Sequence, residues 1–272
     1  MKTKNIFLFV AIFFLSTNII AGNCEKYNFA FKPGEKCQYD LYFNWGFIWI
    51  KAASSELSVK EKIYKGIPVY ELKMASSTIK TFKRFDLQDT MLSYVDKETL
   101  FPYYVKQSSK EPDYFAKNRL IFFNTDTTFG IYLEEERKKG TKRDTIIYNK
   151  CFFDLVSTLY RFRNIDSKKL KPNEKIPMPM VFTDEIYELS LRYAGKEKVE
   201  LHNGKSYNCL IVKSTLAEGK FFEKGEGMTI WISDDENHIP LMIEAKMKLG
   251  SLKAVLSKVQ NNRHPISSEI KE

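Results

Sequence analysis

Histidine is scarce in this 272-residue sequence, which has only three, His202, His238 and His264. They lie in two expected hairpin turns and near the C-terminus, whereas a metal site needs clustered His, Cys or carboxylate ligands. The sequence also contains no GxSxG, no HExxH and no phosphate-binding glycine loop. We therefore expect no metal and no cofactor, and we can name no catalytic residue, although a triad assembled from distant residues would leave no motif.

Cysteine is also infrequent, and no two of the four cysteines form a CxxC motif. All four lie beyond the N-terminal 22 residues, in the part expected to be exported, where disulfides are permitted. Two pairings are candidates: Cys151 with Cys209, which would tie a central helix to a later strand, and Cys24 with Cys37, which would keep the loop short. The alternative is that these cysteines are small buried residues without a bridge.

Beyond its N-terminus the sequence lacks any apolar run of about 18 residues, the length that crosses a membrane as a helix. Residues 1–22 have the features of a secretory signal peptide, because Lys2 and Lys4 precede an apolar core and Ala21 and Gly22 supply small residues for cleavage. The cleavage box is imperfect, so its position is open by a residue or two. We expect an exported protein, periplasmic or associated with the outer envelope, that is not transmembrane in its mature form.

Acidic residues are outnumbered, with 34 Asp and Glu against 43 Lys and Arg. The excess is mostly lysine scattered along the chain, which is typical of a solvated surface. We therefore expect no nucleic-acid partner, and weak attraction to anionic membrane surfaces fits the composition better.

Segments in which apolar and polar residues alternate cover most of the chain. From Lys36 to Asn44, for example, Cys37, Tyr39 and Leu41 fall on one side of a half-buried strand. About fourteen such segments, separated by turn-forming residues, predict strands joined in an antiparallel meander. We therefore expect a mainly β fold, a curved sheet or barrel, with one central amphipathic helix packed against it.

The domain organisation follows from this meander. We expect one large β domain over residues 23–259, or two halves over 30–150 and 151–259. The residues after the last predicted strand are polar, so we expect residues 260–272 to form a flexible tail.

One stretch has the period of a helix. From Phe152 to Arg163 the apolar residues fall on one broad face, and Asp154 is placed to cap the N-terminus. Arg163 projects near the centre of the apolar face. It either extends past the helix end to solvent or is buried against a carboxylate.

A candidate partner for Arg163 comes from the last predicted hairpin, where Glu244 is a carboxylate among apolar neighbours. Either charge would be costly to bury alone, so we predict that Arg163 pairs with Glu244 or, as second choice, with Asp89. Aromatic residues near these positions complete the candidate ligand-binding set. Its members are Arg163, Glu244, Asp89, Tyr160, Trp231 and Tyr94.

Paired acidic residues offer a route to catalysis. Asp86 with Asp89, and Asp234 with Asp235, have the residue types of a general acid and base. Asp is frequent in turns for local hydrogen-bonding reasons, however, so these pairs carry little weight. Whether the protein is an enzyme stays open, and we favour a non-enzyme.

Several segments in the mature chain share one further property, a resemblance to a known family. They are Gly34-Glu35 through Trp45-Gly46, Ser93 to Asp96, Leu100 to Pro102, Asp154 to Arg163, Gly227 to Asp235, Ile239-Pro240 and Gly250 to Leu252. In order and spacing they resemble the exported bacterial family catalogued as domain of unknown function 3108. The resemblance implies an envelope location and a mostly antiparallel β architecture, and it implies no activity. A comparison of this shape with periplasmic carriers of lipids or lipoproteins is fold-level analogy.

These observations favour a non-enzymatic binder or carrier of an apolar or amphipathic ligand, such as a lipid, in a β cavity with the helix as plug or lid. The 21 Phe and 15 Tyr fit such a cavity, although they also fit a packed core. The alternative is a structural or adaptor module in envelope assembly, with an envelope protein as partner. A hydrolase acting on glycans comes third, and it would need two carboxylates facing one cleft.

Overall fold

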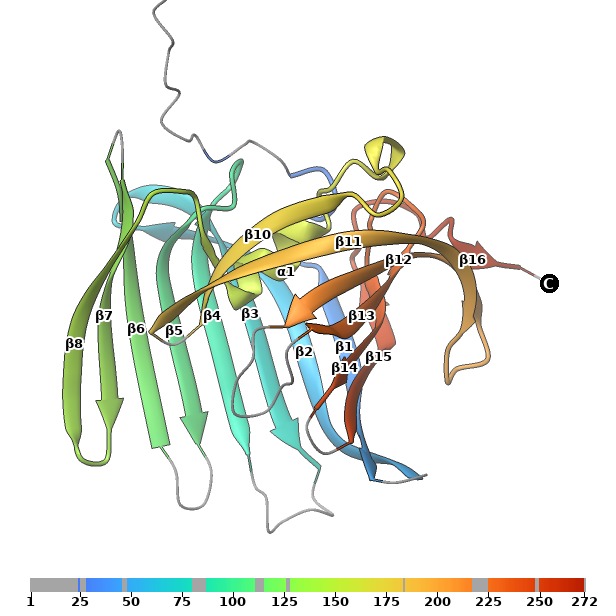
Figure 1. Cartoon of the computed structure of the whole chain (residues 1–272), viewed down its shortest axis with the longest axis horizontal. Helices are drawn as coiled ribbons and strands as arrows, with labels where there is room; N and C mark the ends of the chain where they lie inside the picture. Colours follow the sequence, from blue (N-terminus) through green and yellow to red (C-terminus); the bar gives the residue numbers. More distant parts are fainter. Residues whose placement is uncertain are drawn as a thin grey trace, which may run out of the picture.

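The computed structural model describes residues 24, 28–45, 48–79, 87–110, 115–125, 128–182, 184–216, 225–247 and 250–271, so the predicted signal segment 1–22 and Asp86 lie outside the described residues. The described chain is mainly β with one α-helix, as predicted (Figure 1). Its elements are β1 (Lys36–Trp45), β2 (Ile48–Tyr64), β3 (Ile67–Thr78), β4 (Gln88–Asp96), β5 (Pro102–Lys110), β6 (Phe115–Asn124), β7 (Phe129–Arg137), β8 (Gly140–Tyr148), β9 (Phe153–Asp154), α1 (Leu155–Phe162), the 3-10 turn η2 (Ser167–Lys169), β10 (Lys175–Phe182), β11 (Glu185–Glu200), β12 (Ser206–Leu216), β13 (Gly225–Ser233), β14 (Pro240–Lys246), β15 (Ser251–Gln260) and β16 (Glu269–Ile270).

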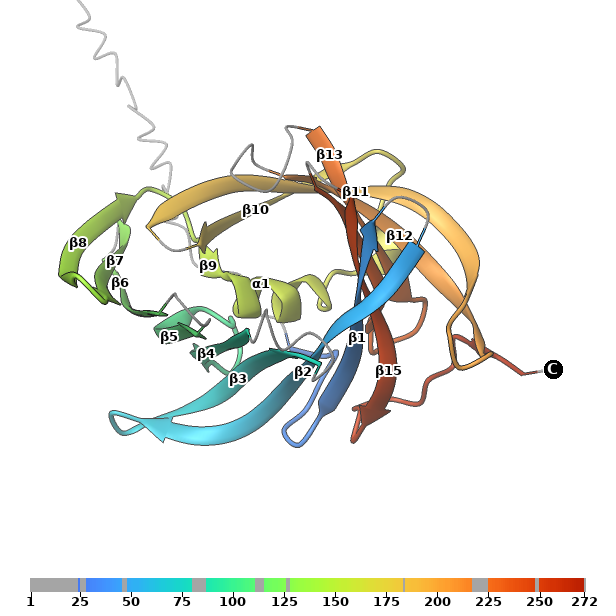
Figure 2. The same cartoon turned by 90° about the horizontal axis from the view of Figure 1, so that it is seen from below.

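All the strands belong to one 16-stranded sheet, whose order is β8-β7-β6-β5-β4-β3-β2-β1-β15-β14-β13-β12-β11-β10-β9, with β16 beside β12. Neighbouring strands are antiparallel except β9 and β10. The sheet curls around α1 (Figure 2). Among the described residues its ends, β8 and β9, are not joined by a strand ladder. The exposed Lys142 of β8 nevertheless reaches Asp184 in the β10–β11 turn, with Nζ 3.4 Å from Oδ2.

Helix α1 forms within the stretch that the apolar period predicted. Asp154 caps it as expected, since its side chain accepts hydrogen bonds from the backbone N–H groups of Val156 and Ser157. The helix lies inside the curved sheet, with β3 and β4 on one side and β10 and β11 on the other (Figures 1 and 2). Its apolar face is therefore covered by strands from both halves of the chain.

The core consists of three clusters of buried side chains that meet at α1. Val156 and Tyr160 pack with β1 to β4, Phe152 and Phe153 with β5 to β7, and Phe162 with β10 to β13. The helix thus joins opposite walls of the sheet, which explains why so short a helix forms inside a β protein.

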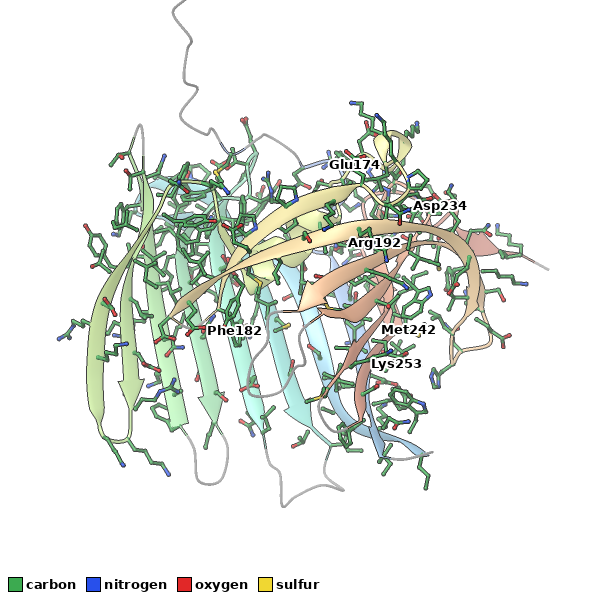
Figure 3. All side chains as sticks on the ribbon, viewed as in Figure 1. Glu174, Phe182, Arg192, Asp234, Met242 and Lys253 are labelled. Atoms are coloured by element: carbon green, nitrogen blue, oxygen red, sulfur yellow. A yellow bond between two sulfur atoms is a disulfide. The ribbon has the colours of Figure 1, made fainter. Side chains whose placement is uncertain are left out.

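The inward side of β2 to β7 changes character along the strands. Near α1 it is apolar and fully buried, as at Val105 and Leu120. Further along the same strands the inward residues are polar or only partly buried, and side chains thin out below α1 in Figure 3. We call this inward surface beyond α1 the lower interior face. It comprises Ser55, Met74, Ser76, Asp89, Met91, Gln107 and Asn118, which pair with one another in register across β2 to β6.

On the other side of the molecule the end of the β11–β12 hairpin folds back over the outer face of the sheet. The ring of His202, in the turn of this hairpin, stacks on Tyr42 of β1 with centroids 4.8 Å apart. The indole N–H of Trp231 donates to Glu197 of β11. This part of the sheet therefore has a second, outer layer of contacts.

The residues after β15 are held in place, so the prediction of a flexible tail is wrong. Strand β16 pairs with β12, and Ser268 Oγ donates to Asp235 Oδ2 at 2.6 Å. The backbone N–H of His264 donates to Asn237 Oδ1 at 2.8 Å. The polar composition of these residues suggested that they would fray. It could not show that a distant turn, around Asp235 and Asn237, supplies hydrogen-bond acceptors for them.

Both predicted disulfide pairings are also wrong. The bridge joins Cys24 to Cys151, with Cα atoms 5.8 Å apart, whereas Cys37 and Cys209 are free and buried. Short loops were favoured in the prediction, but the entropy of loop closure rises only slowly with length. The fold brings the segment before β1 next to the start of the helix region, and this decides the pairing.

Candidate functional site

Arg163 is buried against a carboxylate, as predicted, but the partner is Glu35. The two side chains form a bidentate pair, with Nη1–Oε1 2.5 Å and Nη2–Oε2 3.0 Å. Arg163 is 3% exposed and Glu35 0%. Burial alone would lower the pKa of Arg163, but the adjacent Glu35 carboxylate outweighs this and raises the pKa above its ordinary value.

Backbone groups and aromatic rings from three segments of the chain surround this pair. Arg163 Nε donates to the carbonyl oxygen of Asn237, and its own carbonyl oxygen contacts His238 Nδ1 at 2.8 Å. The rings of Phe31 and Tyr160 each lie 5.5 Å from the guanidinium. The pair therefore ties the segment before β1, the end of α1 and the turn before β14 together.

Cys37 and Tyr160 lie beside this pair. Burial raises the pKa of the Cys37 thiol to about 12 and raises the pKa of Tyr160 as well. Both groups therefore stay protonated at neutral pH, which argues against a nucleophilic role for either. Tyr160, a predicted ligand-binding residue, is 1% exposed and belongs to the core.

Three other predicted site residues lie on the outer side of the sheet. Tyr94 alternates with the inward residues of β4 and forms a ring cluster with Tyr64 and Tyr104, with centroids 5.3 to 5.8 Å apart. Trp231 lies under the folded-back hairpin. Glu244 pairs with Lys253, with Oε2 3.1 Å from Nζ, so its assignment as partner of Arg163 is wrong. Figure 3 places Lys253 on the β15 side, away from the cores of β4 to β7.

Asp89 was predicted as a ligand-binding residue and as the second-choice partner of Arg163, and the pairing with Arg163 is wrong. It lies on the lower interior face together with Gln107 of β5 and Asn118 of β6. Gln107 and Asn118 are direct cross-strand neighbours, and Asp89 is one strand away and one inward position further along. Gln107 is 6% exposed and Asn118 5%. We call these three residues the interior polar cluster.

The interior polar cluster holds unpaired hydrogen-bonding groups. Asn118 Nδ2 donates to Gln107 Oε1 at 3.2 Å. Gln107 Nε2, Asn118 Oδ1 and Asp89 Oδ1 are buried, and each lacks a hydrogen-bond partner among the described residues. Nearly all buried polar side-chain atoms in proteins are paired, so three unpaired ones on adjacent strands are unusual.

Apolar groups next to the cluster are not fully packed. Met74 of β3 and Met91 of β4 are cross-strand neighbours on this face and are only partly buried. Leu155 and Leu159 of α1 are also partly buried, although the helix lies inside the sheet. Apolar surface therefore remains partly exposed on the helix as well as on the strands.

A charged pair borders the cluster on the next strand. Glu135 of β7 is the cross-strand neighbour of Asn118, and its carboxylate contacts the guanidinium of Arg137, two residues further along. The lower interior face thus runs from apolar groups on β3 and β4 to neutral polar groups and then to a charge-paired rim. This gradient suits a molecule with one apolar and one polar end.

The family model for proteins of unknown function DUF3108 matches residues 38–257. The chain belongs to the DUF3108 family. The match spans β1 to β15 almost completely and includes the interior polar cluster, whereas Glu35 lies just before it. This confirms the resemblance that the sequence segments indicated.

One solved structure of similar fold is a β-barrel-like protein of domain of unknown function DUF1849 from Brucella abortus. Its TM-score is 0.52 at 9% sequence identity, and the alignment covers 84% of the DUF3108 chain and 97% of the other. At this identity the likeness concerns the fold alone. A search of curated proteins found no match.

Of the acidic pairs considered for catalysis, only Asp234 and Asp235 of this DUF3108 protein both lie in the described residues, and each has its own polar partners. Asp235 accepts hydrogen bonds from Ser233, Asn237 and Ser268, so it organises its own turn and the tail. Asp234 pairs with Lys196 at the surface, with 2.6 Å between Oδ2 and Nζ. Within the described residues, no three His, Cys, Asp or Glu side chains are grouped to hold a metal ion.

Helix α1 has 8 residues and η2 has 3, and none of the described helices is long and apolar enough to cross a bilayer.

Proposed function

We propose that this DUF3108 protein binds an amphipathic molecule on its lower interior face, as a non-enzymatic binder or carrier in the cell envelope. The observation that carries the proposal is the interior polar cluster, buried and unpaired, beside interior apolar side chains that remain partly exposed. A polar head group would pair with the cluster, and an apolar chain would cover Met74, Met91 and the leucines of α1. The helix then acts as the ceiling of the site.

The energetics support an occupant. Each buried polar group without a partner costs about 1–3 kcal/mol, so a ligand that supplies partners removes a standing cost of the free protein. Apolar contact adds roughly 25 cal/mol for each Å² covered. The two contributions act at adjacent places on one surface, which is what an amphipathic ligand requires.

The N-terminal sequence supports an envelope location. Lys2, Lys4 and the apolar core that follows have the order of a secretory signal peptide, and four cysteines with one bridge fit an oxidising compartment. A carrier of amphipathic molecules is useful in such a compartment, because lipids must cross an aqueous space between membranes.

The test uses two tryptophan substitutions at neighbouring positions. Ser76 faces the lower interior face, where its hydroxyl donates to Ser55, whereas Ser77 is exposed on the other side of β3. Protein is purified from its own envelope without detergent, and bound molecules are measured by native mass spectrometry and solvent extraction. We expect wild type and Ser77→Trp to carry an amphipathic molecule and Ser76→Trp to have lost most of it. Equal occupancy in both variants, or no bound molecule in repeated preparations of wild type, contradicts the proposal.

A second candidate, the adaptor, is favoured by a separate observation on the outer face. Tyr104, Ile121 and Tyr132 are successive cross-strand neighbours on β5 to β7, and Ile147 of β8 lies two residues beyond Thr145, the neighbour of Tyr132. Ile121 is 41% exposed, Tyr132 54% and Ile147 59%. Strand β8 is also an edge of the described sheet, to which an extended segment of a partner can add.

The adaptor hypothesis can be tested independently of ligand binding. A photo-crosslinking residue at position 132 should capture one recurrent envelope protein, and the same residue at Lys198, exposed on β11, should not. Tyr132→Asp should abolish the crosslinked complex formed from a probe at position 147 without changing the bound ligand. Absence of any recurrent partner at position 132 contradicts this second candidate.

A further inference from the structure

We infer that the head group of the ligand is uncharged and rich in hydroxyl groups, as in an amphiphile with a sugar or other polyol head. The inference rests on the proposed function and adds the chemical class of the ligand. It follows from the number and kind of unpaired groups in the interior polar cluster.

The unpaired atoms of the interior polar cluster come from three side chains. Asn118 Nδ2 donates to Gln107 Oε1, which leaves one amide nitrogen, with two N–H donors, and one amide oxygen without partners. If both side-chain amides are turned over, the residues that supply the nitrogen and the oxygen are exchanged, but the cluster still has one of each. Asp89 adds an unpaired oxygen, so the cluster offers two acceptor oxygens and one donor nitrogen.

Head groups differ in how many of these atoms they can pair by hydrogen bonds. A carboxylate or phosphate can accept from the amide nitrogen but places its oxygens against the two acceptor oxygens. An ammonium satisfies the two acceptors but leaves the Gln107 or Asn118 donor unpaired. A hydroxyl group both donates and accepts, so two adjacent hydroxyls satisfy all three groups.

The charges around the cluster also bear on the choice of head group. Asp89 has no cationic partner within hydrogen-bonding distance among the described residues, and the nearby cation Arg137 contacts Glu135. A second negative charge on the ligand would therefore meet a carboxylate without compensation. Anionic head groups are disfavoured on this ground as well.

The experiment compares three probes with the same dodecyl chain: dodecyl glucoside, dodecanoate and dodecyltrimethylammonium. Each is titrated below its micelle concentration into ligand-free protein by calorimetry. We expect the glucoside to bind about tenfold or more tightly than either charged probe, because a site built for hydrogen bonds discriminates strongly against groups that leave them unmade.

Three variants connect this preference to the cluster. Gln107→Leu with Asn118→Leu should lower glucoside affinity by about tenfold and change dodecanoate affinity little. Ser108→Leu, on the same strand but the opposite face, is the matched control and should behave as wild type. Asp89→Asn keeps an acceptor and removes the charge, so it should retain glucoside binding and strengthen dodecanoate binding. Circular dichroism of each variant checks that it is folded.

The outcomes separate the two proposals. If a charged probe binds as tightly as the glucoside, or if the double variant weakens all three probes equally, the head-group inference is wrong while the carrier function stands. If no probe binds and the native protein also carries no molecule, the carrier function is wrong and the head-group inference falls with it.

Discussion

Replacing Arg163 by Leu leaves the Glu35 carboxylate, which is 0% exposed, without its partner. Removing one member of a buried ion pair costs about 3–5 kcal/mol, because the remaining charge is both desolvated and unpaired. The total stability of a domain is only about 5–15 kcal/mol, so this loss is easily measured. Arg163→Ala should cost more than Arg163→Leu, because it also removes the side-chain stem beside Phe31 and Tyr160.

The double variant Arg163→Leu with Glu35→Leu removes both charges at once. Apolar replacement of a whole buried pair is often neutral or even stabilising by about 1–4 kcal/mol. The carbonyl oxygens of Ala30 and Asn237 lose the hydrogen bonds that Arg163 donates, and this lowers the stability of the double variant somewhat. We therefore expect the double variant to be more stable than either single variant, with a coupling energy of about 3 kcal/mol.

The assay is equilibrium urea denaturation followed by tryptophan fluorescence, with all variants at one pH. Glu244→Leu is the matched control, because the Glu244–Lys253 pair is partly exposed, with side chains 28% and 22% accessible. We expect it to cost less than about 1 kcal/mol. Additive losses in the double variant, or a loss for Glu244→Leu as large as that for Glu35→Leu, would refute the reasoning.

Three further predictions concern the bridge, the pH dependence and the cluster. Thiol titration of the unfolded, unreduced protein should find two free thiols, and four would refute the bridge. Removing it by Cys24→Ser with Cys151→Ser opens a loop of 127 residues, which costs about 5 kcal/mol in the entropic model. Burial lowers the pKa of His238 from its ordinary 6.5, so its contribution to stability is present above that pH and lost as the pH falls through the lowered value. His238→Asn is the test, because Asn tolerates the positive φ of 43° at this position and does not titrate in this range. From about pH 7.5 to pH 5 the unfolding free energy of this variant should fall less than that of wild type, and an equal fall would contradict the prediction. Gln107→Leu with Asn118→Leu should raise the unfolding free energy of ligand-free protein by about 1–3 kcal/mol in urea denaturation, whereas a clear loss would show that the amides serve the fold.

The parts of the structure that depend on neighbouring residues were predictable from the sequence. The apolar period from Phe152 to Arg163 placed α1, and Asp154 acts as the cap that its position indicated. Alternation from Lys36 to Asn44 identified β1 and the inward side of Cys37 and Tyr39. In each case the deciding interactions lie within a few residues along the chain.

The partners of these elements could not be predicted, because they depend on how distant segments meet. The position of Arg163 on an apolar face showed that it needed an acid, but the acid is 128 residues away in a turn before β1. Glu244 appeared a better candidate because its neighbours are apolar, yet alternation puts it on the outer side of β14. The disulfide prediction was wrong for the same reason, since the bridge joins Cys24 to Cys151, 127 residues away along the chain.

The interior polar cluster did leave a signal in the sequence, although a weak one. Gln107 follows Val105 by two positions and Asn118 precedes Leu120 by two, so each amide continues the inward side of a strand on which the preceding or following inward residue is apolar and fully buried. Either residue alone resembles the polar end of a strand. Only the register, which sets Gln107 opposite Asn118, shows that the two interruptions coincide and are buried together. Two polar residues that interrupt the apolar side of adjacent strands at the same level are costly to the fold, and this is the cost that the proposed ligand would remove.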